Sequence, residues 1–256
     1  MPLVKDIYGF LDTVAPFENK CDWDNCGLLV GDRDKAVNKI GFTLDLTPDT
    51  LKKAADEGVD LIITHHPVIF RPQSSFLKNN VAYEAAVKGI SVISAHTCYD
   101  CAEEGVSYIL AEILGLENIT EVETEEQPSC VRIGSVAETD AENLAVLVAE
   151  KLGTTVRLSS ADNTIKTVAV CGGSGGDFIY DAVKAGADAY VTGDLSHHHF
   201  LAARETGMTV IAAGHFETEN PSVIPLMNKV SEHFSDIKTI YLKQENPVKF
   251  IKQRGT

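Results

Sequence analysis

Basic residues are scarce in this sequence, and they form no cluster. The 256 residues include 22 Lys and Arg against 37 Asp and Glu, so the formal net charge at pH 7 is −15. Because nucleic acids and anionic membranes attract clustered positive charge, we expect no nonspecific nucleic-acid binding. We expect no membrane insertion either, since no apolar run approaches the roughly 20 residues that span a bilayer.

A recognisable secretion signal is also missing. The first residues, Met-Pro-Leu-Val-Lys-Asp, contain no charged segment followed by an apolar one. We therefore expect a cytoplasmic protein in which the six cysteines are reduced thiols. Cys98 and Cys101 have the Cys-x-x-Cys spacing of a redox pair or of half a zinc site. No second pair with this spacing exists to complete four thiolates, so the roles of these two cysteines stay open.

Alternating strand-like and helical segments indicate an α/β fold. The length favours one large domain or two packed halves, and the alternation is typical of βα units around a parallel or mixed sheet. Before residue 117 we expect strands at 40–44, 59–64 and 90–95 and helices at 4–14, 48–57, 81–88 and 105–114. After residue 130 we expect strands at 131–136, 154–158, 165–170, 188–192, 209–213 and 237–242, helices at 141–151, 176–185 and 196–206, and a last helix ending near Phe234.

Two local features refine this map. Thr47 suits the N-cap of the 48–57 helix, with Pro48 at the first helical position and Gly58 ending the helix. The acidic, polar stretch 117–129 indicates a connection between the two sets of elements.

Histidine and acidic residues follow three of the expected strands. His65 and His66 follow strand 59–64, His96 and Asp100 follow strand 90–95, and His215 and Glu219 follow strand 209–213. Loops at the carboxyl ends of strands in an open α/β sheet meet at a crevice. We therefore predict a metal site whose ligands are His65, His66, Asp100, His215 and Glu219. The alternative for the adjacent pair is two histidines that cap a strand or lie in a solvated turn.

The charge balance of such a site favours two ions bridged by a carboxylate. Paired divalent ions about 3.5 to 4 Å apart repel each other and can act together in hydrolysis. Asp100 and Glu219 would offset the repulsion, especially by bridging. Imidazole with carboxylate suits zinc, manganese, iron, nickel or cobalt. Pro221 is tolerated only in a first helical turn, so we expect a helix that starts near Thr218, with His215 on the turn before it.

Other polar groups lie on the same side of the expected sheets. His96 is a partner of the ligands, a proton donor, or an ordinary histidine at a strand end. We expect Ser196 to cap the 196–206 helix, and we rank His197 and His198 as substrate contacts rather than ligands. The glycine-rich loop 171–177 opens a helix and is either a tight turn or a phosphate cradle. It lacks the third glycine of a dinucleotide fingerprint and the Gly-Lys-Ser/Thr of a P-loop.

Seven short motifs occur in the order of a known family. They are Trp23-Asp24-Asn25-Cys26-Gly27-Leu28, Asp45-Leu46-Thr47-Pro48, Ile63-Thr64-His65-His66-Pro67, His96-Thr97-Cys98-Tyr99-Asp100, Gly172-Gly173-Ser174-Gly175, Thr192-Gly193-Asp194 and Gly214-His215-Phe216-Glu217-Thr218-Glu219. Together they cover nearly the whole chain. The sequence resembles the short form of the Nif-three-like family (NGG-one-interacting factor three-like), often labelled GTP cyclohydrolase I type 2 homologs. One departure is Thr97-Cys98-Tyr99-Asp100, where relatives have Thr-Asn-Leu-Asp.

The resemblance implies a specific architecture. It predicts two packed three-layer α/β/α halves with mixed sheets and a metal site in the crevice between them. Residues 1–125 would form the first half, joined by the C-terminal segment near 214–256, and residues 126–213 the second half. The resemblance also implies a ring-shaped homohexamer.

Within the site, the resemblance places His66 and Asp100 on one ion, His65 and His215 on the other, and Glu219 as the bridge. It further implies a metal-dependent hydrolase of a nucleotide or phosphorylated small molecule. In the GTP cyclohydrolase version, hydroxide attacks C8 of the guanine and opens the imidazole ring, with Glu219 or His96 moving protons. The alternative is a non-catalytic, metal-stabilised binding or regulatory protein that recruits partners.

Overall fold

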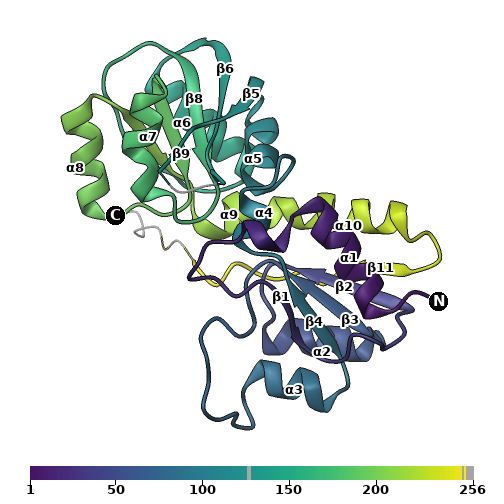
Figure 1. Ribbon diagram of the computed structural model, residues 1–256. Coiled ribbons are helices and arrows are strands. Elements are labelled where there is room, and N and C mark those ends of the chain that lie inside the picture. Colours follow the sequence, from purple (N-terminus) through teal and green to yellow (C-terminus); the bar gives the residue numbers. More distant parts are fainter. Residues whose placement is uncertain (126–127, 250, 252–256) are drawn as a thin grey trace.

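The computed structural model describes residues 1–125, 128–249 and 251. The described strands form two mixed sheets in two lobes, which lie one above the other in Figure 1. No helix in these ranges has the length and apolar character needed to span a bilayer.

The first sheet has five strands in the order β1-β4-β3-β2-β11, and only β1 runs antiparallel to its neighbour. Its strands are β1 (Gly27–Val30), β2 (Lys39–Thr43), β3 (Leu61–Thr64), β4 (Ser91–Ser94) and β11 (Lys238–Tyr241). The surrounding helices are α1 (Val4–Val14), η1 (Phe17–Asn19), α2 (Pro48–Asp56), α3 (Val81–Val87) and α10 (Val223–His233). Adjacent residues on β3 face opposite ways, as strand geometry requires. Ile63 packs with α1 and α10, and Ile62 packs with α2 and α3.

The second sheet has six strands in the order β5-β6-β8-β9-β10-β7, in which β8, β9 and β10 run parallel. Its strands are β5 (Glu117–Glu121), β6 (Arg132–Thr139), β7 (Arg157–Ser159), β8 (Ile165–Cys171), β9 (Ala189–Thr192) and β10 (Thr209–Ala212). Its helices are α5 (Val106–Leu114), α6 (Ala141–Leu152), η2 (Gly176–Phe178), α7 (Ile179–Lys184) and α8 (His197–Thr206). Val191 packs with α5 and α6, whereas Tyr190 packs with α7 and α8. Two three-layer α/β/α halves with mixed sheets are thereby confirmed.

Helix α5 connects the two hydrophobic cores. Its first turns contribute Val106 and Ile109 to the core of the first half, and Leu110 and Leu114 belong to the core of the second half. Three short helices lie near it where the lobes meet: α4 (Thr97–Asp100), α9 (His215–Glu219) and η3 (Asn220–Ser222). A helix shared by both cores holds the two halves against each other at the level of these short helices.

The predicted caps of α2 are confirmed, but the predicted connection is wrong in part. Thr47 accepts a hydrogen bond from the Thr50 amide at 3.2 Å, and Gly58 follows the helix with a φ of 65°. In the stretch 117–129, residues 117–121 form β5, an edge strand paired with β6. An edge strand tolerates charge, so its largely exposed residues look like a linker in the sequence. Residues 126 and 127 of this stretch lie outside the described residues.

The expectation of six reduced thiols is also wrong. Cys101 and Cys130 form a disulfide with an S–S distance of 2.00 Å. It joins the residue after α4 to the loop before β6, across a sequence separation of 29. The fold brings these two cysteines together, whereas their spacing in the sequence gives no sign of it. Cys98 is buried and is not paired with Cys101.

Candidate metal centre

His65 and His66 follow β3 and are held in different orientations. Their backbone amides both donate to Leu44, which lies just past β2. The ring Nδ1 of His65 lies 3.0 Å from the carbonyl oxygen of Ala95, and the ring Nδ1 of His66 lies 2.6 Å from Asp45 Oδ1. Because each Nδ1 is engaged, each Nε2 is left to face a carboxylate of the cluster: His65 Nε2 faces Asp100, and His66 Nε2 faces Glu219.

The remaining three side chains come from short helices. Asp100 ends α4, His215 begins α9, and Glu219 ends α9 one turn later. The predicted helix start near Thr218 is therefore wrong. Gly214, with a φ of 93°, turns the chain directly into the helix at His215, and α9 ends before Pro221, which lies in η3. His215 and Glu219 share one helix face, with His215 Nε2 lying 3.1 Å from Glu219 Oε2.

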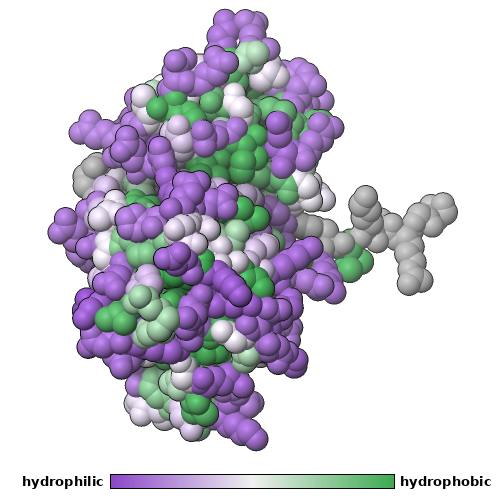
Figure 2. All heavy atoms as spheres, turned by 90° about the vertical axis from the view of Figure 1, so that its right-hand side faces the viewer, coloured by the Kyte–Doolittle hydropathy of each residue, from purple (hydrophilic) through white to green (hydrophobic). Residues whose placement is uncertain are grey.

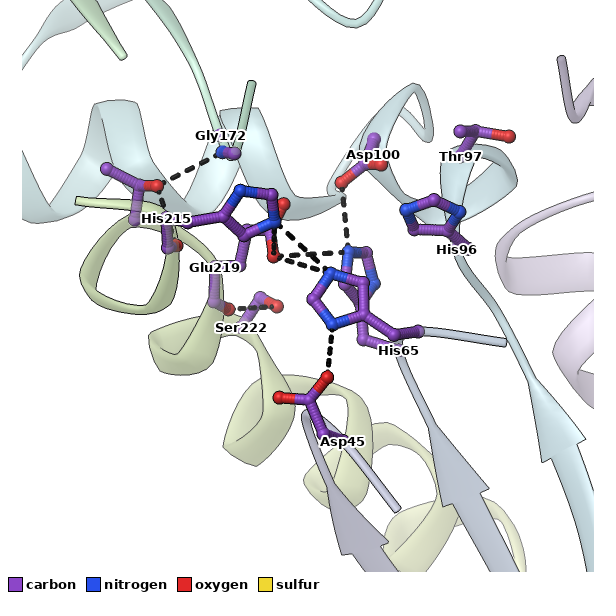
Figure 3. A network of polar contacts seen from close by, with 12 residues as sticks. Asp45, His65, His96, Thr97, Asp100, Gly172, His215, Glu219 and Ser222 are labelled. Carbon is purple, nitrogen blue, oxygen red and sulfur yellow. Dashed lines mark hydrogen bonds and ion pairs between the residues drawn. The ribbon is translucent and has the colours of Figure 1, made fainter. Parts of the chain in front are cut away.

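The five predicted ligands converge as two triads that share Glu219. One triad is His65, Asp100 and Glu219, and the other is His66, His215 and Glu219. His65 Nε2 lies 3.4 Å from Asp100 Oδ1 and 3.8 Å from Glu219 Oε2. Glu219 Oε2 also lies 3.0 Å from His66 Nε2. One carboxylate oxygen thus faces three imidazoles (Figure 3).

The chemistry of the cluster fits divalent ions. His65 Nε2, Asp100 Oδ1 and Glu219 Oε2 are all buried and have no hydrogen-bond partner among the described residues, although such atoms are costly to leave unsatisfied. His66 Nε2 and His215 Nε2 lie 3.3 Å apart. Two ligand atoms that each lie about 2.1 Å from one tetrahedral ion are separated by about 3.4 Å. These separations therefore suit atoms that share an ion.

The grouping of the ligands differs from the one that the resemblance implied. His65 lies with Asp100 and His66 with His215, where the opposite pairing was expected. The strand end sends the two rings to different sides, and only the fold shows which ring meets which partner. A third group, His65, His66 and His96, also has ligand atoms within 4.8 Å of one another.

The cluster shifts the pKa values of its own members. Burial alone lowers the pKa of His65, but the carboxylates of Asp100 and Glu219 outweigh it and raise that pKa well above its usual value. Burial likewise opposes protonation of His215, yet Asp194 and Glu219 raise its pKa to about 10. Burial raises the pKa of Glu219, but the facing imidazoles of His215 and His65 outweigh burial and bring that pKa well below its usual value. The cluster therefore holds Glu219 as a carboxylate and attracts positive charge.

Two further carboxylates orient the ligands, and sequence reasoning did not assign them this role. Asp45 Oδ1 lies 2.6 Å from His66 Nδ1, and Asp194 Oδ2 lies 2.8 Å from His215 Nδ1. Carboxylates that hold metal-binding histidines in this way fix the tautomer and the direction of the ring. Both aspartates lie in motifs that contributed to the family resemblance, Asp45-Leu46-Thr47-Pro48 and Thr192-Gly193-Asp194. These motifs were the available sign of the two carboxylates, although no role was assigned to them.

His96 belongs to a separate carboxylate–histidine pair beside the triads. Its Nδ1 lies 2.9 Å from Oδ1 of Asp24, whose side chain is fully buried. Asp24 also accepts hydrogen bonds from the amide and the hydroxyl of Thr97. Burial raises the pKa of Asp24, but the bond from His96 and its other hydrogen bonds outweigh this and hold the pKa well below the usual range. The ring of His96 is thereby fixed at the edge of the cluster (Figure 3).

Four of the five ligands, His66, Asp100, His215 and Glu219, line a cavity of about 630 Å³. The described residues that line it are Cys21, Trp23, His66, Pro67, Phe70, His96, Thr97, Asp100, Glu125, Cys130, Cys171, Gly172, Ser174, Asp177, Phe178, Asp181, His215 and Glu219. They come from both halves of the chain, and the volume is in the range of small-molecule sites. A crevice between the halves is therefore present at the cluster.

The glycine-rich loop 171–177 fits the tight-turn alternative. The amides of Gly172, Gly173 and Gly175 donate to the hydroxyls of Ser107, Thr218 and Thr192. These amides are therefore not available to an anion. At Gly173, with a φ of 63°, a Cβ would lie 2.0 Å from Glu219 Oε1, so glycine there lets Glu219 reach the cluster.

His197 and His198 do not line this cavity, and their ranking as substrate contacts stays a prediction. Both are exposed at the start of α8, which follows Ser196, the predicted N-cap. Ring nitrogens of His198 lie 3.0 and 3.2 Å from Ser196 Oγ. Helix α8 holds both histidines on an outer surface. The sequence pattern does not show which way this helix faces.

Comparison with known proteins places the chain in a family. The family model Duf34/NIF3 (NGG1p interacting factor 3) matches residues 2–247. The chain is 34% identical over 260 residues to a GTP cyclohydrolase 1 type 2 homolog of Clostridium perfringens, covering 97% of this chain and 99% of that protein. The homolog of Clostridium acetobutylicum is 33% identical, covering 96% and 98%.

Solved structures agree with this match. The crystal structure of Staphylococcus aureus protein SA1388 has a TM-score of 0.88 and 27% identity, covering 98% of this chain and 99% of that one. The structure titled reduced HcgD from Methanocaldococcus jannaschii has a TM-score of 0.82 and 29% identity, covering 95% and 98%. The resemblance found in the sequence motifs is confirmed: the chain belongs to the Duf34/NIF3 family.

Proposed function

We propose that this protein is a metal-dependent hydrolase with two divalent ions per chain. One ion would be held by His65, Asp100 and Glu219, and the other by His66, His215 and Glu219. The observation that carries the proposal is the convergence of two triads on Glu219, one of which consists of three buried ligand atoms without a hydrogen-bond partner among the described residues. The adjoining cavity of about 630 Å³ supplies room for a small molecule.

Bound ions would supply Lewis acidity and a lowered pKa of water, and the protein groups around them divide the remaining tasks. Glu219, held as a carboxylate, contributes charge that balances two cations. His96 is fixed through Nδ1 by Asp24, which leaves its other ring nitrogen free to exchange a proton with a ligand in the cavity. Asp45 and Asp194 keep the His66 and His215 rings in place.

The names of relatives support a narrower version of the proposal. Those with 30 to 34% identity are called GTP cyclohydrolase 1 type 2 homologs, which favours ring-opening hydrolysis of a guanine nucleotide. Hydrolysis of another nucleotide or phosphorylated small molecule is the broader version. The homohexamer and the cytoplasmic location expected from the sequence stay predictions.

Metal removal and reloading test the proposal. The protein is stripped with a chelator, reloaded separately with Zn, Mn, Fe, Ni or Co, and assayed with GTP and with p-nitrophenyl phosphate. We expect hydrolysis of one of them to depend on metal and to fall at least 100-fold in His66→Ala. His197→Ala, which removes an exposed histidine outside the cavity, is the matched control and should keep full activity.

Two results would contradict the hydrolase proposal. In the first, His66→Ala loses metal but keeps the activity. In the second, metal raises the melting temperature without producing hydrolysis of either compound, which would favour the metal-stabilised binding protein.

A further inference from the structure

The cavity beside the metal centre has an excess of negative charge. Among the described residues that line it, Asp100, Glu125, Asp177, Asp181 and Glu219 carry carboxylates, and none is Lys or Arg. Even two divalent ions would not give five carboxylates a net positive charge. The lining therefore offers no lysine or arginine to a polyanion, and the positive charge of a protonated His215 ring in the metal-free protein does not outweigh the five carboxylates.

The surface next to the cavity, the acidic rim, also has more carboxylates than basic side chains. Two basic side chains lie nearby in the described residues: Lys184 Nζ is 3.5 Å from Asp181 Oδ1, and Arg132 Nη1 is 3.6 Å from Glu121 Oε2. Glu121, Glu123 and Glu125 line an adjoining hollow with the same aspartate and lysine. The whole chain carries a formal charge of −15, and Figure 2 shows hydrophilic side chains over much of one face, with hydrophobic ones gathered mostly in its upper half. Because like charges repel over about 10 Å at moderate salt, a polyphosphate would meet an unfavourable field.

Phosphate-binding devices are also missing from the described lining. Proteins bind phosphoryl groups with Arg, Lys or free amides at helix N-termini. In the glycine-rich loop beside the cluster, three amides donate to hydroxyls of the protein instead. A phosphate monoester carries about two negative charges at pH 7, and a triphosphate carries more. Contact with the metal ions would be its only strong attraction.

One wall of the same cavity is aromatic. The ring centroids of Trp23, Phe70 and His96 lie 5.9 to 6.2 Å from one another. Trp23 is 59% exposed and Phe70 is 41% exposed, which is a large apolar surface left open to water. Phe178 lines the cavity from the second half of the chain. A flat ring that stacks on such a surface buries apolar area and forms favourable aromatic contacts.

We propose that this cavity binds a flat aromatic or heteroaromatic small molecule that is neutral or cationic, and that it discriminates against polyphosphorylated forms of the same ring. The proposal rests on the proposed function for the position of the metal centre, and it favours a substrate without a polyphosphate over the version in which the substrate is GTP. Ring contact with Trp23 and Phe70 supplies the affinity, and the acidic rim supplies the selectivity.

Trp23 is the only tryptophan of the chain, so its fluorescence reports on the cavity wall alone. Metal-free and metal-loaded protein are titrated with guanosine, GMP and GTP, which share one ring and differ in charge. We expect saturable quenching by guanosine in both forms. In the metal-free form, Kd should rise from guanosine to GMP to GTP, by at least tenfold overall at low salt, and the difference should shrink as salt is added.

Substitutions separate the charge selectivity of the cavity from its affinity for the aromatic ring. Asp177→Asn, at an exposed rim position, should strengthen GTP binding to the metal-free protein about threefold, as expected for one like charge removed near the ligand. It should leave guanosine binding unchanged. Asp56→Asn, which removes an exposed carboxylate of α2, is the control and should change neither. Phe70→Leu should weaken guanosine binding, and circular dichroism checks that the variant is folded.

The proposal is overturned if metal-free protein binds GTP as tightly as guanosine, or if neither compound quenches Trp23. A failure of the proposed hydrolase function would look different. It would remove metal-dependent turnover and leave quenching by guanosine in place.

Discussion

Replacing Asp45 with Asn is expected to weaken metal binding by 10- to 100-fold, which is the usual range for groups that orient a metal-binding histidine. Asp45 Oδ1 faces His66 Nδ1 at 2.6 Å, and Asp45 Oδ2 accepts a hydrogen bond from Gln244 Nε2 at 2.6 Å. The side-chain oxygen of Gln244 is itself held by the Asp45 amide at 2.9 Å. The glutamine therefore cannot turn over to suit a new partner.

An asparagine at position 45 has one acceptor and one donor where the aspartate has two acceptors. Whichever way it turns, its NH₂ group meets either the His66 ring or the Gln244 amide, and both need an acceptor. The expected loss of metal affinity corresponds to about 1.4 to 2.7 kcal/mol, since each factor of ten is about 1.4 kcal/mol. It falls on the ion held by the His66 triad, because Asp45 contacts no other ligand of the cluster in the described hydrogen bonds.

Competition with a coloured chelator measures this loss. Metal-free wild type, Asp45→Asn and Asp56→Asn are titrated with zinc in the presence of the chelator, and circular dichroism confirms that each is folded. Asp56→Asn makes the same chemical change at an exposed site of α2 and should match wild type. The reasoning is refuted if folded Asp45→Asn binds zinc within twofold of wild type.

Three further predictions concern charge, pH and the disulfide. Glu219→Gln should reduce metal content from two ions to one or none per chain, because the shared carboxylate oxygen is lost; elemental analysis that still finds two ions would contradict this. The raised pKa of His215, about 10 against the usual 6.5, stabilises the metal-free fold below pH 6.5, and this stabilisation is lost as pH rises toward 10. Thermal unfolding should therefore show a melting temperature of the metal-free protein that falls over that window. The melting temperature of the metal-loaded protein should rise, because protons no longer compete with the ions. The same dependence of melting temperature on pH in both forms would refute the prediction. Alkylation of denatured protein without reductant should leave Cys101 and Cys130 unmodified, and peptide masses showing both alkylated would contradict the disulfide.

The position of the candidate site was predictable because one rule of α/β folds places it. His65, Asp100 and His215 each follow a strand, and loops at the carboxyl ends of strands meet. That rule needs only the order of strands and loops, which hydrophobic patterns show well. The same patterns predicted most helices and strands to within a few residues, including α1 at 4–14.

Features that depend on long-range contacts could not be predicted. The grouping of His65 with Asp100 depends on the direction of each ring at the end of β3. Strand β5 was missed because an exposed edge strand lacks the apolar alternation that reveals buried strands. The disulfide between Cys101 and Cys130 requires the loop before β6 to reach the end of α4. Each of these follows from the packing of the two halves rather than from a local pattern.

The central claim is that two cations share Glu219, and anomalous diffraction at the metal edges tests it most directly. Crystals of metal-loaded protein should show two anomalous peaks per chain. We expect one peak at bonding distance from His65, Asp100 and Glu219, and the other at bonding distance from His66, His215 and Glu219. A single peak, no peak after loading with any of the five metals, or a pair of peaks not bridged by Glu219 would contradict the account.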